Sequence, residues 1–233
     1  MMFDSDLRVS TRTNTIDDRI VTLKVGPAPT TDFSVHEGIL TEHSTFFRSA
    51  LDNRWREGRS RVVEMPEDSA DVATAFVEWL YFRRIASKPV FPPLLPMDDG
   101  EYAFLARLYA FGEKVQADPF CDDCLTAMVL KTDEVAEDGT RTFPSHSAIT
   151  TLYNSTPGDS PARRFVVDMY VDFGMNAWIP REPDVNHPEF LADLAHAFMA
   201  NRPDGPQHKQ TNYHRRRKWH KRERSREFLQ PAD

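Results

Sequence analysis

The sequence predicts an α+β fold, with three short strands near the N-terminus and amphipathic helices after them. β-Branched and alternating segments gather at residues 20–25, 32–36 and 61–65, as is typical of strands. Apolar residues then recur with a period near 3.6, which indicates helices that cover a core. The length agrees, because 233 residues allow one or two domains with a sizeable core.

The strand segments begin with a β-hairpin. The turn signal Gly26-Pro27 follows residues 20–25, and residues 32–36 alternate Phe33 and Val35 with polar side chains. Before the third strand, which Pro66 closes, grouped apolar residues predict two short helices. These residues are Ile39, Leu40, Phe46, Phe47 and Leu51.

Three longer helices follow the strands. Asp68 is the expected N-cap of the first, and four prolines between residues 87 and 100 predict a loop before the second. In the second, Gly112 would let another backbone approach closely, and Asp118-Pro119 begins the third. The apolar faces of the first two are Val72, Phe76, Trp79 and Leu80, and then Leu105, Leu108, Tyr109, Gly112 and Val115.

After a polar break, three further segments predict a helical extension. They begin near Ser145, Ser160-Pro161 and His187-Pro188. Their expected apolar faces include Phe165, Met169 and Phe173, and then Phe190, Leu191, Leu194, Ala195 and Phe198. The predicted organisation is a flexible arm (1–18), a first domain (19–132), the extension (143–200) and a basic, disordered tail (201–233).

The net charge of −7 hides an acidic body and a basic tail. Residues 1–200 hold 19 Lys and Arg against 32 Asp and Glu, whereas residues 201–233 hold 10 against 4. Any contact with nucleic acid would therefore come from the tail, which also resembles a nuclear-import signal; a solvated, disordered end is the alternative to both. The residues concerned are Arg215, Arg216, Arg217, Lys218, Lys221 and Arg222.

Composition indicates a protein of the nucleus, the cytoplasm or both. Two cysteines are too few for a disulfide framework and suit a reducing compartment. The longest apolar run is well below the ~20 residues of a membrane span, and the first ten residues lack the apolar stretch of a secretory signal. No membrane partner is therefore expected.

Motifs that carry chemistry are missing from the sequence. It contains no Gly-rich phosphate loop, GxSxG elbow, HExxH helix or calcium loop. We therefore expect no catalytic residues, no cofactor, no metal and no small-molecule substrate, with an enzyme of unrecognised type as the alternative. Cys121 and Cys124 form a single CxxC, which favours a place in the core over a zinc site. His36 and His43 are expected to cap or pack.

Several segments carry a family resemblance. IVTLKVGP, FSVHEGILTEHSTFFRSAL, WREGRSRVVEMPEDSADVATAFVEWLYFRRI and YAFLARLYAFGEKVQ follow the order and spacing of a BTB/POZ domain of the fungal type, over residues 19–132. The resemblance implies a small mixed sheet flanked by a cluster of short helices, and a protein-interaction module without an active site. SPARRFVVDMYVDFG and PEFLADLAHAFM resemble the helical C-terminal extension of fungal members.

The resemblance also implies partners, because BTB domains pair with themselves or recruit other proteins. Some members carry a buried charged pair at positions where this chain has Ile20 and Glu37, so dimers that recruit corepressors are not implied. Members that serve as adaptors for cullin ubiquitin-ligase scaffolds present a hydrophobic-x-Glu motif before the third strand. Trp55, Arg56 and Glu57 fit that motif and are the predicted partner contact, unless Trp55 packs over its own domain.

Overall fold

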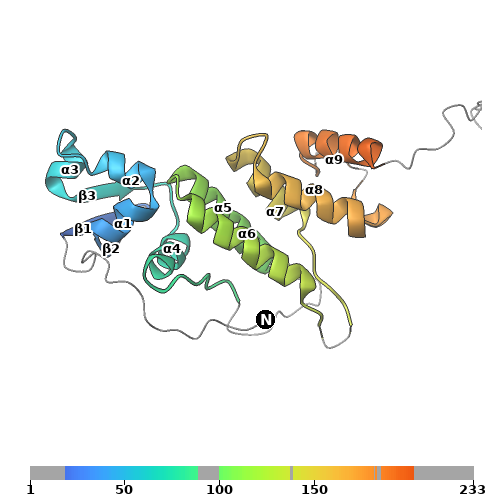
Figure 1. Cartoon of the computed structure of the whole chain (residues 1–233), viewed down its shortest axis with the longest axis horizontal. Helices are drawn as coiled ribbons and strands as arrows, with labels where there is room; N and C mark the ends of the chain where they lie inside the picture. The colour runs from blue at the N-terminus through green and yellow to red at the C-terminus, as the bar shows by residue number, and fades with distance from the viewer. Residues whose placement is uncertain (1–18, 89–99, 137–138, 181, 183–184, 202–233) are drawn as a thin grey trace, which may run out of the picture. The chain divides into compact units, whose positions relative to one another are not determined.

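The computed structural model describes residues 19–88, 100–136, 139–180, 182 and 185–201 (Figure 1). The chain divides into two compact units, residues 1–194 and 195–233, and the described part of the second contains the last turns of helix α9. In order, the elements are β1 (Ile20–Val25), β2 (Thr31–His36), α1 (Glu37–His43), α2 (Thr45–Ala50), α3 (Arg56–Ser60), β3 (Val62–Met65), α4 (Ala70–Phe82), α5 (Gly100–Lys114), α6 (Asp118–Asp133), α7 (His146–Ser155), α8 (Pro161–Phe173), the 3-10 helix η1 (Asn176–Trp178) and α9 (Pro188–Ala200).

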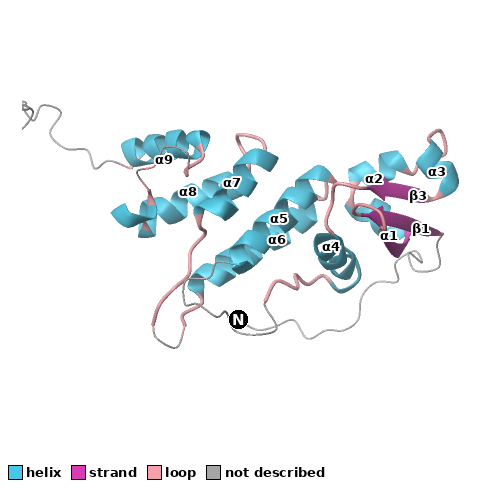
Figure 2. Ribbon diagram, turned by 180° about the vertical axis from the view of Figure 1, so that it is seen from behind, coloured by secondary structure: helices cyan, strands magenta, loops and turns pink. Residues whose placement is uncertain are grey.

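The three strands form one mixed sheet in the order β2-β1-β3, of which Figure 2 labels β1 and β3 in magenta. β1 pairs antiparallel with β2, with Val21 opposite Val35, and parallel with β3, with Leu23 opposite Val63. Along β1 the buried residues alternate with less buried ones, because successive side chains of a strand point to opposite faces. The predicted hairpin and the mixed sheet are confirmed.

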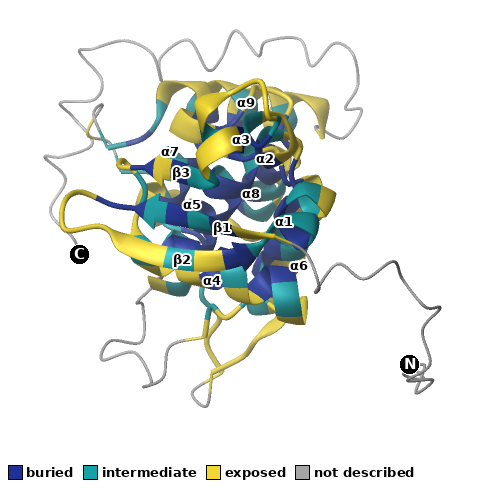
Figure 3. Ribbon diagram, turned by 90° about the vertical axis from the view of Figure 1, so that its left-hand side faces the viewer, coloured by how far each residue is buried: buried dark blue, intermediate teal, exposed yellow. Residues whose placement is uncertain are grey.

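The core of the first unit is built from aromatic side chains between α4, α5 and α6. The Phe76 ring lies 5.2 Å from that of Phe111 and 5.1 Å from that of Phe120, measured between centroids. Trp79 is fully buried, and its Nε1 donates to Asp123 Oδ2 at 2.6 Å. Figure 3 shows buried residues along the inner helices, whereas β2 is largely exposed. Phe76 and Trp79 therefore lie in the core, as predicted.

Gly112 is the point where α5 and α6 approach closely. A Cβ added there would lie 2.6 Å from Cys121 Sγ and 3.0 Å from Phe120 Cδ1, which only glycine avoids. Cys121 and Cys124 are both free and buried, as predicted, and burial raises the pKa of each thiol well above its ordinary value.

Helix α7 packs along α5, and α8 packs on α7 (Figure 1). The hydroxyl of Tyr109 in α5 lies 3.2 Å from that of Ser160, the N-cap residue of α8. Within the extension, the buried Arg163 donates from Nη2 to the carbonyl of Tyr153 at 2.6 Å and from Nη1 to Glu189 Oε2 at 2.6 Å. This one guanidinium therefore joins α7, α8 and α9.

Three local predictions were wrong. Ser69, not Asp68, is the N-cap of α4, because the Asp68 carboxylate instead pairs with Lys114 Nζ at 2.8 Å. Ala117, not Asp118, is the N-cap of α6. Two short helices were predicted before β3, whereas the structure has three, because Arg61 in a left-handed conformation closes the additional short helix α3.

The predicted apolar face of α8 was also wrong. Phe173 is exposed, whereas the buried residues are Ala162, Arg163, Val166, Val167 and Tyr170. Packing against α7 buries the other face of the helix, which carries Val166, Val167 and Tyr170. In α9, Phe190 and Leu194 are buried and Phe198 is exposed. The predicted arm, most of the proline-rich loop and nearly all of the basic tail lie outside the described residues.

Candidate protein-interaction surface

Trp55 is the N-cap residue of α3, and its side chain is exposed. Its backbone is extended, with φ −96° and ψ 160°, and 60% of the residue is accessible to solvent. The backbone is nevertheless fixed on both sides: the Trp55 N–H donates to the Asp52 carbonyl at 2.9 Å, and the Trp55 carbonyl accepts from the Arg59 N–H at 3.2 Å. The backbone that carries this large, exposed aromatic side chain is thus held in a defined position.

Gly58 allows α3 to lie close to the preceding turn. A Cβ at this position would clash with the Asp52 carbonyl oxygen. Because that oxygen belongs to the backbone, a rotation of side chains could not remove the clash. Arg61 then ends the helix in the left-handed region, with φ 56°, and its N–H donates to the Glu57 carbonyl at 2.8 Å. Any residue with a side chain at position 58 would therefore force α3 away from the backbone of Leu51 and Asp52.

Arginines flank Trp55 in the sequence and are exposed: Arg54, Arg56 and Arg59. Arg54 pairs with Asp52 at 2.8 Å, and this guanidinium lowers the pKa of the Asp52 carboxyl. Arg56 reaches Glu57 at 3.6 Å and Glu64 at only 4.0 Å, so both pairs are loose. We call Trp55, Arg54, Arg56, Glu57 and Arg59 the Trp55 surface. Tryptophan and arginine are enriched among the residues that dominate binding energy at protein interfaces.

Glu37 and Arg61 form an ion pair that connects the end of α3 to the sheet and to α1. Arg61 Nη1 lies 3.1 Å from Glu37 Oε1, and both side chains are largely buried. The Arg61 carbonyl accepts from the Thr22 N–H of β1 at 2.9 Å, and Arg61 Nη1 also donates to the Leu51 carbonyl at 2.9 Å. Glu37, which departs from the family pattern, therefore has a charged partner, supplied by the residue that ends α3.

The other residues considered in the sequence have structural roles or lie elsewhere. His36 Nδ1 is 2.7 Å from the Tyr81 hydroxyl, and the His43 ring packs edge-on to Trp79 with centroids 5.4 Å apart, as the packing interpretation predicted. The six tail residues Arg215, Arg216, Arg217, Lys218, Lys221 and Arg222 lie outside the described residues, so their role stays a prediction.

Metal-binding clusters and membrane-spanning helices are two features that the described residues lack. No group of three or more His, Cys, Asp or Glu side chains in this part of the chain is placed to hold a metal ion. Among the described helices, none combines the length and the apolar composition needed to cross a membrane.

Sequence reasoning selected Trp55, Arg56 and Glu57 but missed the residues that position them. Gly58 and Arg61 fix the turn, and Arg59 adds an exposed charge. The signal available in the sequence was the density of arginine, four residues among positions 54–61 in a body that is otherwise acidic.

Residues 15–113 match the model of the BTB/POZ domain family. This span contains the whole sheet, helices α1 to α4 and nearly all of α5, and its fold is the α+β fold of a BTB domain. Domains of this family generally mediate protein–protein interaction. A search of curated proteins found no sequence with significant similarity to the chain. The fungal type and the kinship of the C-terminal helices therefore stay predictions.

Proposed function

We propose that the chain is a BTB-type adaptor that binds the N-terminal domain of a cullin ubiquitin-ligase scaffold through the Trp55 surface. The observation that carries the proposal is the exposed Trp55 side chain on a backbone held by Asp52 and Arg59. Its place between α2 and β3 is where the family's adaptor members present a hydrophobic-x-Glu motif, and Glu57 follows two residues later.

Burial of Trp55 at an interface would supply a useful share of the binding free energy. Covering most of this side chain removes on the order of 100 Å² of apolar area from water, about 2.5 kcal/mol at ~25 cal/mol/Å². The flanking arginines add charge-assisted hydrogen bonds to an acidic partner face and steer its approach. Because the Trp55 backbone is held before binding, no backbone ordering cost opposes this gain, and only the side chain must be ordered.

The test compares two exposed aromatic residues in the full chain. Trp55→Ala is expected to lower the affinity for a purified cullin N-terminal domain roughly thirtyfold or more, the equivalent of at least ~2 kcal/mol. Phe82→Ala is the matched control, because Phe82 is 70% exposed at the end of α4 and lies away from the motif. Both variants should melt like the wild type, and calorimetric titration gives the affinities.

Two results would contradict the proposal. One is no binding of the wild-type chain at micromolar concentration, and the other is equal binding by the wild type and Trp55→Ala. Light scattering of the same samples measures self-association, the other interaction that the family resemblance implies. A dimer that Trp55→Ala dissociates would assign the Trp55 surface to a second copy of the chain instead.

A further inference from the structure

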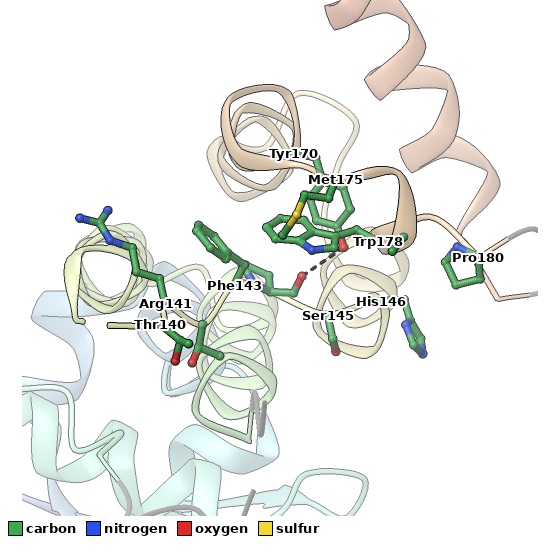
Figure 4. Close-up of a pocket in the computed structure, with 12 residues that line it drawn as sticks. Thr140, Arg141, Phe143, Ser145, His146, Tyr170, Met175, Trp178 and Pro180 are labelled. Carbon is green, nitrogen blue, oxygen red and sulfur yellow. Dashed lines mark hydrogen bonds between the residues drawn. The ribbon is translucent and has the colours of Figure 1, made fainter. Parts of the chain in front are cut away.

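A cavity of about 620 Å³ lies between the segment that leads into α7 and the segment that follows α8 (Figure 4). Its apolar wall consists of Phe143, Tyr170, Met175 and Trp178, with two prolines beside them. The ring centroids of Phe143 and Trp178 lie 4.8 Å apart, and those of Tyr170 and Trp178 lie 5.3 Å apart. Volume and lining are those of sites that take small organic ligands.

Hydrogen bonds hold the cavity wall in place without a ligand. The Tyr170 hydroxyl donates to the Pro144 carbonyl at 3.3 Å, which joins α8 to the segment before α7. The buried Asn186 donates from Nδ2 to the Pro180 carbonyl at 3.0 Å, which fixes the far end of the second segment. A preformed wall reduces the ordering cost of binding.

Apolar surface remains uncovered at this cavity. Met175 is 64% exposed although it lines the cavity. Phe173, whose ring is tilted against that of Phe143 with centroids 5.2 Å apart, is also exposed. Flat aromatic rings and an accessible thioether suit a planar apolar ligand, which would stack on Trp178 and Phe143 and contact the sulfur of Met175.

The charges at the cavity select the polar end of the ligand. No Asp or Glu is among its lining residues, in contrast with the acidic body of the chain. Arg141 lines the cavity, is exposed, and has no hydrogen-bond or ion-pair partner among the described residues. Figure 4 shows Arg141 and His146 on opposite sides of the aromatic cluster. A carboxylate or sulfonate on a planar body can therefore pair with Arg141 while the body lies on the rings.

We propose that this cavity binds a small organic acid with a planar apolar body, stacked on Phe143 and Trp178 and paired through its anionic group with Arg141. The site is separate in sequence from the Trp55 surface, since it is built from residues 140–180. Its occupant would be a free small molecule, so the site adds ligand recognition to the proposed adaptor role without depending on it.

The experiment uses two fluorescent probes that differ by one group. 8-Anilinonaphthalene-1-sulfonate carries an anion on a planar apolar body, and N-phenyl-1-naphthylamine is the same body without the sulfonate. The full wild-type chain is expected to bind the sulfonate saturably, at one site, and about tenfold more tightly than the neutral probe. Equal affinities for the two probes, or no saturable binding, would overturn the proposal.

Substitutions locate the site. Arg141→Gln should weaken the sulfonate about tenfold and leave the neutral probe unchanged, whereas Arg84→Gln, at an exposed arginine outside the cavity and the Trp55 surface, should change neither. Trp178→Ala should weaken both probes. Arg141 has no hydrogen bond or ion pair with a described residue, so its variant tests the proposal even where Trp178→Ala unfolds, and sulfonate binding by Arg141→Gln at wild-type affinity would refute it.

Discussion

Replacing Gly112 by alanine adds one methyl group at the contact between α5 and α6. The new Cβ would lie 2.6 Å from Cys121 Sγ and 3.0 Å from Phe120 Cδ1, whereas non-bonded heavy atoms prefer ~3.5–4.0 Å. Both neighbours are buried, so neither side chain can turn out to solvent. The two helices must therefore separate slightly or the side chains must leave their preferred rotamers.

Two effects of opposite sign set the magnitude. Alanine in a helix interior is favoured over glycine by about 1 kcal/mol, whereas overpacking a well-packed core costs about 1–3 kcal/mol. Because the clash with sulfur is severe and neither partner can move away, we take the upper part of that range, ~2–3 kcal/mol. The expected loss in the free energy of unfolding is therefore about 1–2 kcal/mol.

Urea denaturation followed by circular dichroism measures this loss, and a second variant tests its cause. Cys121→Ala removes the clashing sulfur and should cost ~1–2 kcal/mol alone, since it leaves a small cavity. In the double variant the added methyl group fills that space, so the combined cost should fall at least ~1 kcal/mol below the sum of the two. Gly158→Ala, where a Cβ meets nothing within 4 Å, is the control and should leave stability nearly unchanged.

The reasoning would be refuted if Gly112→Ala were as stable as the wild type. It would also fail if the costs of Gly112→Ala and Cys121→Ala were simply additive, because the clash with the sulfur would then not be the cause.

Two other predictions concern buried polar groups. Arg163→Met should lower the free energy of unfolding by about 2–4 kcal/mol, because the carbonyls of Tyr153 and Thr156 lose their donor. Arg163→Lys should lose less, because lysine can replace only part of these hydrogen bonds. Equal free energies of unfolding for Arg163→Met and the wild type, measured by urea denaturation, would contradict this. The raised pKa values of the Cys121 and Cys124 thiols mean that the folded chain keeps protons that the unfolded chain loses above pH ~8.5. The contribution of the buried thiols to the free energy of unfolding should therefore be fully present below that pH and decrease as the pH rises above it. An unchanged free energy of unfolding between pH ~7.5 and ~9.5 would contradict the burial of the thiols.

Much of the fold could be predicted because its signals are local. The β-branched residues of 20–25, the turn signal Gly26-Pro27 and the alternation in 32–36 predicted the hairpin, and the proline in the first turn marked the starts of α8 and α9. The spacing of Phe76 and Trp79 identified the core face of α4. Each of these signals depends on the periodicity of one element or on the chemistry at its end.

The candidate site was only partly predictable. The motif drew attention to Trp55, but its exposure depends on whether another element covers it, which a single sequence does not state. Arg61 ends α3 and pairs with Glu37, a contact between residues 24 positions apart. No local pattern connects two such positions.

The sequence by itself determined the strands, most helices and the division into an acidic body and a basic tail, because composition and short-range periodicity encode them; the order of its segments carried the resemblance to a BTB/POZ domain. Tertiary structure alone decided which stripe of α8 faces inward, that Gly58 and Arg61 hold Trp55, and that Arg141, Phe143 and Trp178 line one cavity. The physical reason is the same in each case: burial and contact depend on which elements pack together, and that is a property of the whole chain rather than of any segment.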